Sequence, residues 1–329
     1  MLAHLTGYWV SQLVFVAAKL GIAEQLARGP RTPEALAKKV GADPGALRRV
    51  LRALASIGIF AETARGTFKL TPLAATLRED APSSLKNFAL MIVEGYNWSA
   101  WQELLDGVKT GLLPFPRVHG QPIFDYLRDH PEDDRIFSAS MASISGPENA
   151  AVARALDFGR FRTLVDVGGA HGHLLATILG RHRRLRGTLY DQPQVVANAP
   201  ASRFITAKAV AGRISVEGGN FFNAVPQGAD AYIMKYIMHD WTDDQCARIL
   251  GHCRRAMAPG GRVLVVEHVI RPGNAPDWGK MLDINMLVLT GGRERTKDEF
   301  AALFARAGLR LRRVHKTEAA VSVVEASAA

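Results

Sequence analysis

Cysteine is scarce in this chain of 329 residues, which contains only Cys246 and Cys253. Both fall in one predicted helix, where a separation of seven residues corresponds to about 10 Å, too far for a disulfide. Their spacing matches no metal-binding motif, so the sequence excludes a disulfide-stabilised secreted domain and a cysteine-based zinc site. We therefore expect a cytoplasmic protein in a reducing compartment.

Long apolar runs are also missing. The longest one near the start, Leu13 to Ala23, is interrupted by Lys19 and is too short to span a bilayer. No basic and apolar leader with a small-residue cleavage site is present. The sequence thus predicts no membrane span and no secretion signal.

Aromatic side chains make up 8% of the chain and are absent from its basic clusters, residues 181–186 and 310–316. The net charge of +10 by itself fits a nucleic-acid partner. A protein that binds single strands, however, needs aromatic rings between its basic residues. We interpret both clusters as solvated faces and expect no nucleic-acid partner.

The length exceeds the size at which a single core stops growing, so we expect two domains. The first, residues 1–85, begins with an apolar helical stripe and continues with two capped helix starts and two short strands. The order of helix, turn, helix and hairpin is that of a winged helix, which serves either to read DNA or to dimerise. The features that carry this prediction are Thr32-Pro33, Asp43-Pro44, and the strands near 59–60 and 67–70.

The second domain, residues 86–329, changes character within itself. Residues 86–158 are irregularly helical and rich in large apolar groups, and we interpret them as a linker that contributes to a ligand pocket. From Arg160 onward, strand-length apolar runs alternate with helices, which predicts an α/β fold with a Rossmann-like, mainly parallel sheet. The last two runs follow closely enough to form an antiparallel hairpin. The expected strands are 163–167, 187–190, 213–216, 231–236, 261–267, 309–314 and 320–324.

The first of these strands leads into a glycine-rich turn that begins at Asp166 and includes Gly168, Gly169 and Gly172. Glycines at this place let the backbone approach a ligand closely. Their spacing differs from the Gly-x-Gly-x-x-Gly of dinucleotide-binding turns. The Asp166 carboxylate would repel a pyrophosphate but attract the cationic amino-acid end of S-adenosylmethionine. We favour S-adenosylmethionine over NAD, and a purely structural turn is the alternative.

The next two strands end in residues suited to a nucleoside. Asp191 can accept hydrogen bonds from both hydroxyls of a ribose, in either cofactor, or act as a helix N-cap. Asn220 and Phe221 offer a polar side chain and an aromatic face beside an adenine. These residues indicate a nucleoside but do not distinguish between the two cofactors.

The fourth strand carries the residues of greatest interest. Lys235 interrupts an apolar run, which is costly unless its ammonium lies over a ligand. His239 follows where the strand ends, just before a helix start marked by the capping-box spacing of Thr242 and Gln245. A histidine is more often a structural residue, but at the ligand-binding edge of such a sheet we interpret His239 as functional.

Together these residues resemble the small-molecule O-methyltransferases, which include plant caffeate and flavonoid enzymes and bacterial antibiotic-tailoring relatives. The resemblance covers nearly the whole chain and is most specific around His239-Asp240-Trp241. The matching segments are the winged helix, 164–172, 191–193, 218–222, 234–244, 265–267 and 291–296.

The resemblance implies that His239 is the general base, flanked by Glu267 and Glu294. It also implies a methyltransferase sheet, a homodimer built by the first ninety residues, and an acceptor ring clamped between the thioethers of Met141 and Met286. The cofactor would be held by Asp166, Gly168, Asp191, Asn220, Phe221 and Lys235. One departure is Asn220, since the family usually has an acidic residue there.

The resulting hypothesis is methyl transfer from S-adenosylmethionine to a hydroxyl of a small aromatic molecule. A phenol has a pKa of about 10 and an ordinary histidine about 6.5, so we expect proton removal to be coupled to methyl transfer. No cluster of two aspartates and an asparagine suggests a magnesium enzyme, and we expect no metal. The alternatives are a DNA-binding regulator with an inactive second domain, and a relative that has changed its chemistry.

Overall fold

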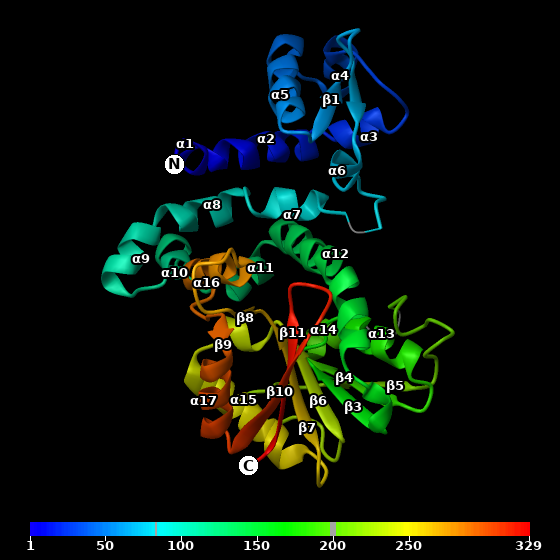
Figure 1. The fold of residues 1–329 in the computed structure, drawn as a ribbon, viewed down its shortest axis with the longest axis vertical. Helices are drawn as coiled ribbons and strands as arrows, with labels where there is room; N and C mark the ends of the chain where they lie inside the picture. The colour runs from blue at the N-terminus through cyan, green and yellow to red at the C-terminus, as the bar shows by residue number, and fades with distance from the viewer. Residues whose placement is uncertain (83, 198–201) are drawn as a thin grey trace. The chain divides into compact units, whose positions relative to one another are not determined.

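The computed structural model describes residues 1–82, 84–197 and 202–329, which form two compact units (Figure 1). The first unit comprises residues 1–103 and 115–145, and the second comprises residues 104–114 and 146–329. Each has its own hydrophobic core.

The first unit contains the predicted winged helix. Thr32 accepts a hydrogen bond from the Ala35 N–H at 3.2 Å, and Asp43 accepts one from the Ala46 N–H at 2.7 Å, so both predicted helix starts are confirmed. The two strands pair antiparallel. The elements are α1 Leu2–Leu5, α2 Gly7–Lys19, α3 Ile22–Leu26, α4 Pro33–Val40, α5 Pro44–Ser56, β1 Phe60–Glu62 and β2 Phe68–Leu70.

Short helices follow the winged helix. Most belong to the first unit, but α9 belongs to the second, and the 25-residue α12 passes from one to the other with Pro147 inside it. These helices are α6 Pro72–Ala75, α7 Lys86–Met91, α8 Gly95–Gln102, α9 Leu104–Thr110, α10 Pro114–His119, α11 Ile123–Asp129 and α12 Pro131–Ala155.

The first two helices leave large apolar side chains in contact with solvent. Leu5 is 66% exposed, Tyr8 54% and Trp9 56%, and Leu2 and Val10 are exposed as well. The winged-helix core is complete without them, because it is built from other residues such as Leu51 and Phe68. A contiguous apolar surface of this kind is typical of a protein interface.

The second unit is built on a seven-stranded sheet in the order β10-β11-β7-β6-β3-β4-β5. Strands β3 to β7 are parallel, and β10 and β11 form the predicted antiparallel hairpin at one edge. The predicted sheet is therefore confirmed, with strand ends that differ by a few residues. The strands are β3 Thr163–Val167, β4 Arg186–Asp191, β5 Ile214–Gly218, β6 Ala231–Lys235, β7 Arg262–Glu267, β10 Leu309–Lys316 and β11 Ser322–Ala328.

Both faces of this sheet are covered, because side chains alternate along each strand. In β3, Val165 and Val167 pack in the core that includes α15 (Asp243–Ala256) and α17 (Lys297–Arg306). Leu164 points to the opposite core, with α13 (His173–Arg181) and the end of α12. Figure 1 shows these helices on the two sides of the sheet.

The strand order places a ligand site. Strand β3 is central, the chain continues through β4 and β5 on one side of it, and β6 and β7 lie on the other. In such sheets ligands bind at the carboxyl ends of the strands where the order reverses. A small parallel pair, β8 (Val269–Ile270) with β9 (Arg295–Thr296), and α16 (Trp278–Leu289) complete the unit. Among the described helices, none is long and apolar enough to cross a membrane.

Candidate active site

The glycine turn after β3 is tight enough to require its glycines. Gly168 has φ +71° and donates its N–H to the Tyr190 carbonyl at 2.8 Å. A Cβ on Gly169 would lie 2.5 Å from the Leu189 side chain and 2.7 Å from the Asp166 carboxyl, which neither neighbour can accommodate without moving. Ala170 adopts φ +49°, a strained conformation for a residue with a side chain. Strain of this kind is characteristic of ligand-binding turns.

Two carboxylates lie beneath and beside this turn. Asp191 accepts hydrogen bonds from the Ala170 N–H at 2.9 Å and the Gln192 N–H at 2.7 Å, so it fixes the turn. Asp166 is 1% exposed, and its Oδ2 has no hydrogen-bond partner in the described parts of the chain. Burial, aided by repulsion from Asp191, raises the pKa of Asp166 to about 7. An unpartnered buried carboxyl is costly, and a cationic ligand would relieve that cost.

Asn220 and Phe221 lie in the loop after β5. The Asn220 Oδ1 accepts the Phe222 N–H at 2.9 Å, so the amide already organises its own loop. The Phe221 ring makes edge contacts with Phe222 and Trp241, with centroids 4.9 and 6.2 Å apart. This aromatic group stands near the end of the sheet where an adenine is expected.

Lys235 has protein partners that the sequence did not indicate. Its ammonium lies 2.7 Å from the Glu148 carboxylate and donates to the Asn149 side chain at 3.1 Å. Both partners come from the last part of α12. The cost of burying this lysine is therefore offset by an ion pair, even before any ligand is considered.

His239 occupies a short 3-10 turn, Met238–Asp240, immediately after β6. The residue is 8% exposed, and its Nδ1 lies 2.7 Å from the Glu294 Oε1. Its backbone N–H donates to the Glu267 Oε1 at 3.1 Å. Since a carboxylate is an acceptor only, we assign the proton of the neutral ring to Nδ1, which leaves Nε2, 3.7 Å from the Asp240 Oδ1, as the nitrogen that accepts a proton.

Buried carboxylates make His239 an unusually strong base. Burial alone lowers the pKa of His239, but the charges of Asp240, Glu294 and Glu267 outweigh it and raise the pKa to about 10. Burial in turn raises the pKa of Glu267 to about 7 and that of Asp240 to about 6. The base strength of His239 thus approaches that of a phenolate, unlike the ordinary histidine assumed from the sequence.

The segment that carries Glu294 is also fixed in place. The Glu294 N–H donates to the Asp283 carboxylate on α16 at 2.8 Å. Gly292 packs against the backbone of residues 239 and 240, where any Cβ would overlap the His239 carbonyl. The glycine at 292 is therefore required for Glu294 to reach the imidazole.

Tyr236 is a further site residue that sequence reasoning missed. Its backbone has φ +56°, and its ring stacks on that of His239 with centroids 5.1 Å apart. The Tyr236 hydroxyl donates to Glu148 at 2.7 Å and lies 3.2 Å from the His268 Nε2. Burial and the Glu148 charge raise the pKa of Tyr236, so the phenol remains protonated. A chain of polar groups thus connects Lys235 to the surroundings of His239.

The remaining predicted site residues are two methionines. Met286 is buried on α16, and its sulfur lies 3.8 Å from the Thr290 hydroxyl. Met141 is half-buried on the part of α12 that belongs to the first unit. A clamp formed by both sulfurs remains a prediction.

The ligand atoms of His239, Glu267 and Glu294 lie within 4.8 Å of one another, a spacing compatible with a metal ion. The set offers one imidazole nitrogen and two carboxylates, which are ligands that many divalent cations accept. In the structure the His239 Nδ1 is hydrogen-bonded to the Glu294 Oε1, and the Glu267 Oε1 accepts the His239 backbone N–H. The expectation of a metal-free site remains a prediction.

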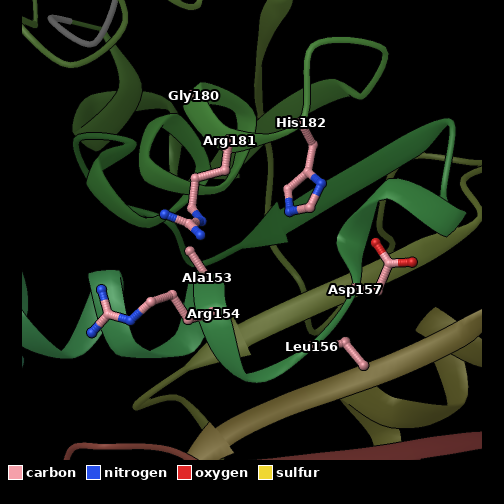
Figure 2. A pocket seen from close by; sticks show the side chains of 7 residues that line it. All are labelled: Ala153, Arg154, Leu156, Asp157, Gly180, Arg181 and His182. Atoms are coloured by element: carbon pink, nitrogen blue, oxygen red, sulfur yellow. The ribbon is translucent and has the colours of Figure 1, made fainter.

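A hollow of about 580 Å³ lies elsewhere in the second unit (Figure 2). The glycine turn precedes the first residue of α13, whereas this hollow surrounds the last one. It therefore lies at the opposite end of that helix from the candidate site. Its lining residues are Ala153, Arg154, Leu156, Asp157, Gly180, Arg181 and His182.

Comparisons with known proteins agree with this geometry. Residues 101–310 match the O-methyltransferase domain family, and residues 2–80 match the O-methyltransferase dimerisation domain. The chain belongs to the S-adenosylmethionine-dependent O-methyltransferases. The phenazine O-methyltransferase PhzM of Lysobacter antibioticus is 45% identical over 326 residues, which cover 99% of this chain and 95% of the relative.

Solved structures of such methyltransferases have the same fold. The crystal structure of LaPhzM is 44% identical, covers 100% of this chain and 98% of its own, and superposes with a TM-score of 0.93. CalO1, a methyltransferase of calicheamicin biosynthesis in its SAH-bound form, is 37% identical, covers 99% of this chain and 96% of its own, and has a TM-score of 0.89.

The relatives also include an enzyme that methylates nitrogen. The phenazine-1-carboxylate N-methyltransferase of Pseudomonas aeruginosa is 32% identical over 94% of this chain and 91% of its own.

Membership of this methyltransferase family identifies the chain as an enzyme and its cofactor as S-adenosylmethionine. The residues at the turn fit that cofactor, because the buried Asp166 Oδ2 has no hydrogen-bond partner among the described residues and Gly168 and Gly169 leave no room for side chains. Family membership also favours dimerisation over DNA reading as the role of the winged helix.

Proposed function

We propose that this enzyme methylates a hydroxyl group on a small, largely aromatic molecule, with His239 as the general base. The observation that carries the proposal is the buried imidazole, whose Nδ1 is held by Glu294 at 2.7 Å while Nε2 remains available. A base must present one nitrogen in a fixed tautomer, and a carboxylate behind the ring provides this.

The protein's part in the reaction is to position the acceptor and take its proton. S-adenosylmethionine supplies a methyl group that is already electrophilic on its sulfonium. His239, with a pKa near that of a phenol, would accept the hydroxyl proton as the methyl group passes from the sulfonium to the oxygen and S-adenosylhomocysteine is left. Glu294 and Glu267 stabilise the imidazolium that results. At neutral pH the free imidazole is the minor form, so turnover rises with pH.

The cofactor would be held by residues around the turn. Asp166 would face the ammonium, Gly168 would allow close backbone approach, and Asp191 would accept hydrogen bonds from the ribose hydroxyls. Asn220 and Phe221 would contact the adenine. Lys235, at the end of β6 and paired with Glu148, would also contribute to cofactor binding.

The acceptor is proposed to be aromatic because the family resemblance assigns two methionines to its binding. Met141 and Met286 offer soft, adaptable sulfur contacts to a ring. Relatives that act on phenazines and other aromatic compounds support this class of acceptor. The existence of N-methyltransferases among the relatives makes methylation of a ring nitrogen or amine the second candidate.

The assembly proposed is a homodimer in the cytoplasm, without a nucleic-acid partner. The exposed apolar surface of α1 and α2, including Leu5 and Trp9, supports dimerisation. Residues 1–85 form the dimerisation domain and 86–329 the methyltransferase domain, with 86–158 contributing to the acceptor pocket. The two free, buried cysteines support a reducing compartment.

A screen of phenolic acceptors with methyl-labelled cofactor tests this proposal. His239→Ala should reduce turnover by about 10²–10⁴-fold and leave cofactor affinity nearly unchanged. His182→Ala, at the far end of α13, serves as the matched control and should keep full activity. Exhaustive chelation of divalent metals should not change the turnover of the wild-type enzyme or of the His182→Ala control. A stable His239→Ala protein with normal turnover would refute the role of the histidine.

A further inference from the structure

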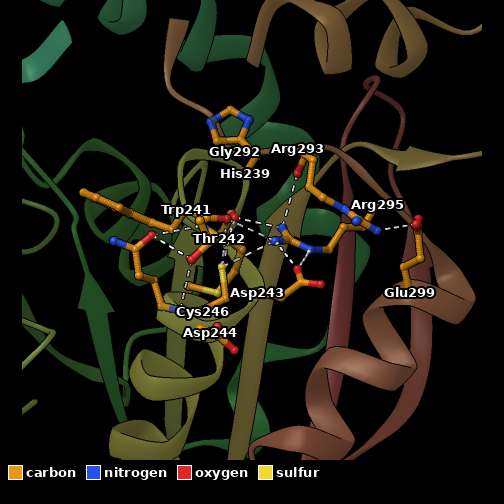
Figure 3. A network of polar contacts seen from close by, with 12 residues as sticks. His239, Trp241, Thr242, Asp243, Asp244, Cys246, Gly292, Arg293, Arg295 and Glu299 are labelled. Carbon is orange, nitrogen blue, oxygen red and sulfur yellow. Dashed lines mark hydrogen bonds and ion pairs between the residues drawn. The ribbon is translucent and has the colours of Figure 1, made fainter. Parts of the chain in front are cut away.

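A buried arginine lies behind the proposed base. Arg295 is 0% exposed and occupies β9, directly after Glu294. A guanidinium cannot give up its charge, so its complete burial is costly unless every donor is paired. The contacts of Arg295 show where that cost is offset (Figure 3).

The guanidinium binds the backbone on both sides of His239. Its Nη1 donates to the carbonyl of Met238 at 2.8 Å, and its Nη2 donates to the carbonyl of Trp241 at 3.2 Å. These two carbonyls bracket His239 and Asp240. The Arg295 guanidinium, a rigid planar group, therefore holds both ends of the short turn that carries the imidazole.

The same guanidinium also fixes the segment that carries Glu294. Nη1 donates to the Arg293 carbonyl at 3.2 Å, while the Arg295 backbone follows Glu294 directly. The two partners of the 2.7 Å contact between His239 and Glu294 are 55 residues apart in sequence. One side chain thus connects the segment of the base to the segment of its carboxylate.

Asp243 orients the guanidinium in turn. Its Oδ1 accepts from Nε of Arg295 at 3.1 Å and from Nη2 at 2.8 Å. Asp243 is the first residue of α15, and its side chain is 37% exposed. Its neighbour Asp244 is 89% exposed at the side chain and pairs with Arg306, which also lies 3.8 Å from the Asp243 Oδ2. No hydrogen bond or ion pair joins Asp244 to Arg295, so Asp244 provides a natural comparison.

We infer that Arg295 and Asp243 are positioning residues for catalysis, which set the register between the His239 imidazole and the Glu294 carboxylate. Lysine cannot replace the arginine, because a single ammonium cannot reach two backbone carbonyls and a carboxylate in one plane. The inference rests on the proposed role of His239. It predicts that kcat falls by a larger factor than the affinity for the cofactor, in protein that is still folded.

The test compares two pairs of variants in the full-length enzyme. Arg295→Lys should lower kcat by about 10–100-fold, because small displacements of a catalytic group are costly, while Arg293→Lys should stay within about twofold. Asp243→Ala should lower kcat by about 3–30-fold and Asp244→Ala by less than about twofold. Both members of the aspartate pair remove one negative charge from the first turn of α15, so effects on the helix are matched.

Three measurements separate positioning from stability: kcat, the Kd for S-adenosylhomocysteine by calorimetry, and the melting temperature. Reduced kcat in folded Arg295→Lys and Asp243→Ala, with Kd within about twofold of wild type, supports the inference. Normal kcat per folded molecule in Asp243→Ala, with only a lower melting temperature, overturns it. Because the Asp243 side chain is partly exposed, Asp243→Ala is expected to fold. It therefore provides the test if Arg295→Lys does not fold. If His239→Ala itself retains full turnover, His239 is not the general base. That result refutes the proposed function and is distinct from a failure of the positioning role of Arg295 and Asp243.

Discussion

The two units of this enzyme depart from the usual distribution of side chains in opposite ways. In the first, large apolar groups such as Leu5 and Trp9 are exposed on α1 and α2. In the second, charged groups such as Glu267, Glu294 and Arg295 are almost completely buried. An exposed apolar surface is stable when another protein covers it, whereas buried charges persist when they support chemistry. The comparison therefore assigns assembly to one unit and catalysis to the other.

The largest effect is expected on assembly. A Leu5→Asp, Trp9→Asp double variant places two charges on the apolar surface and should weaken dimerisation by at least about 10³-fold, since two anchors are lost. Analytical ultracentrifugation should then show a monomer at micromolar concentration. Ile57→Asp, at the C-cap of α5 where the apolar side chain is 48% exposed, is the control and should remain dimeric. A wild-type protein that sediments as a monomer would refute the assignment of the first unit.

Cofactor binding should be affected next. If Asp191 binds both ribose hydroxyls as proposed, Asp191→Ala should remove two charge-assisted hydrogen bonds and cost about 2–4 kcal/mol of binding free energy in calorimetry with S-adenosylhomocysteine. Asp157 lines the hollow at the other end of α13, so Asp157→Ala should bind S-adenosylhomocysteine with the wild-type affinity. Because Asp191 also fixes the turn through the Ala170 N–H, the loss should be accompanied by a lower melting temperature. Unchanged affinity would place the nucleoside elsewhere.

A smaller effect concerns stability and pH. The pKa of Asp166 is raised to about 7 in the folded protein, so its stabilising contribution is present below about pH 4 and is lost as the pH rises through 7. Asp166→Asn should therefore raise the melting temperature of the unliganded enzyme above pH 7, by about 2–4 °C for each kcal/mol of cost removed. The same change should weaken cofactor binding. Asp244→Asn, on the surface, should leave the pH dependence unaltered.

The sequence predicted the elements that depend on local signals. The winged-helix starts at Thr32 and Asp43 follow from N-cap chemistry, and the strands follow from apolar runs. The glycine turn was predictable because only glycine tolerates both its backbone angles and its close contacts. These signals lie within a few residues of the structure that they specify.

The sequence did not predict which distant side chains meet. Glu148 and Lys235 form an ion pair although they lie on different elements, and Glu148 follows no recognisable motif. Arg295 falls within residues 291–296, a segment that resembles the family but gives no sign that this arginine is buried. Its neighbour Arg293 is 43% exposed at the side chain, so sequence alone could not distinguish the two. Their difference depends on tertiary packing around α15.

The most direct test of the account compares wild type and His239→Ala across phenolic acceptors of graded acidity, at several pH values. If His239 accepts the proton, the rate ratio should be largest, about 10²–10⁴, for weakly acidic phenols, and should shrink for acidic phenols and at high pH. The wild-type rate should rise with pH toward the pKa of about 10 that the buried carboxylates give His239. A ratio that stays constant across acceptors and pH would contradict proton transfer to His239 and leave the histidine a purely structural residue.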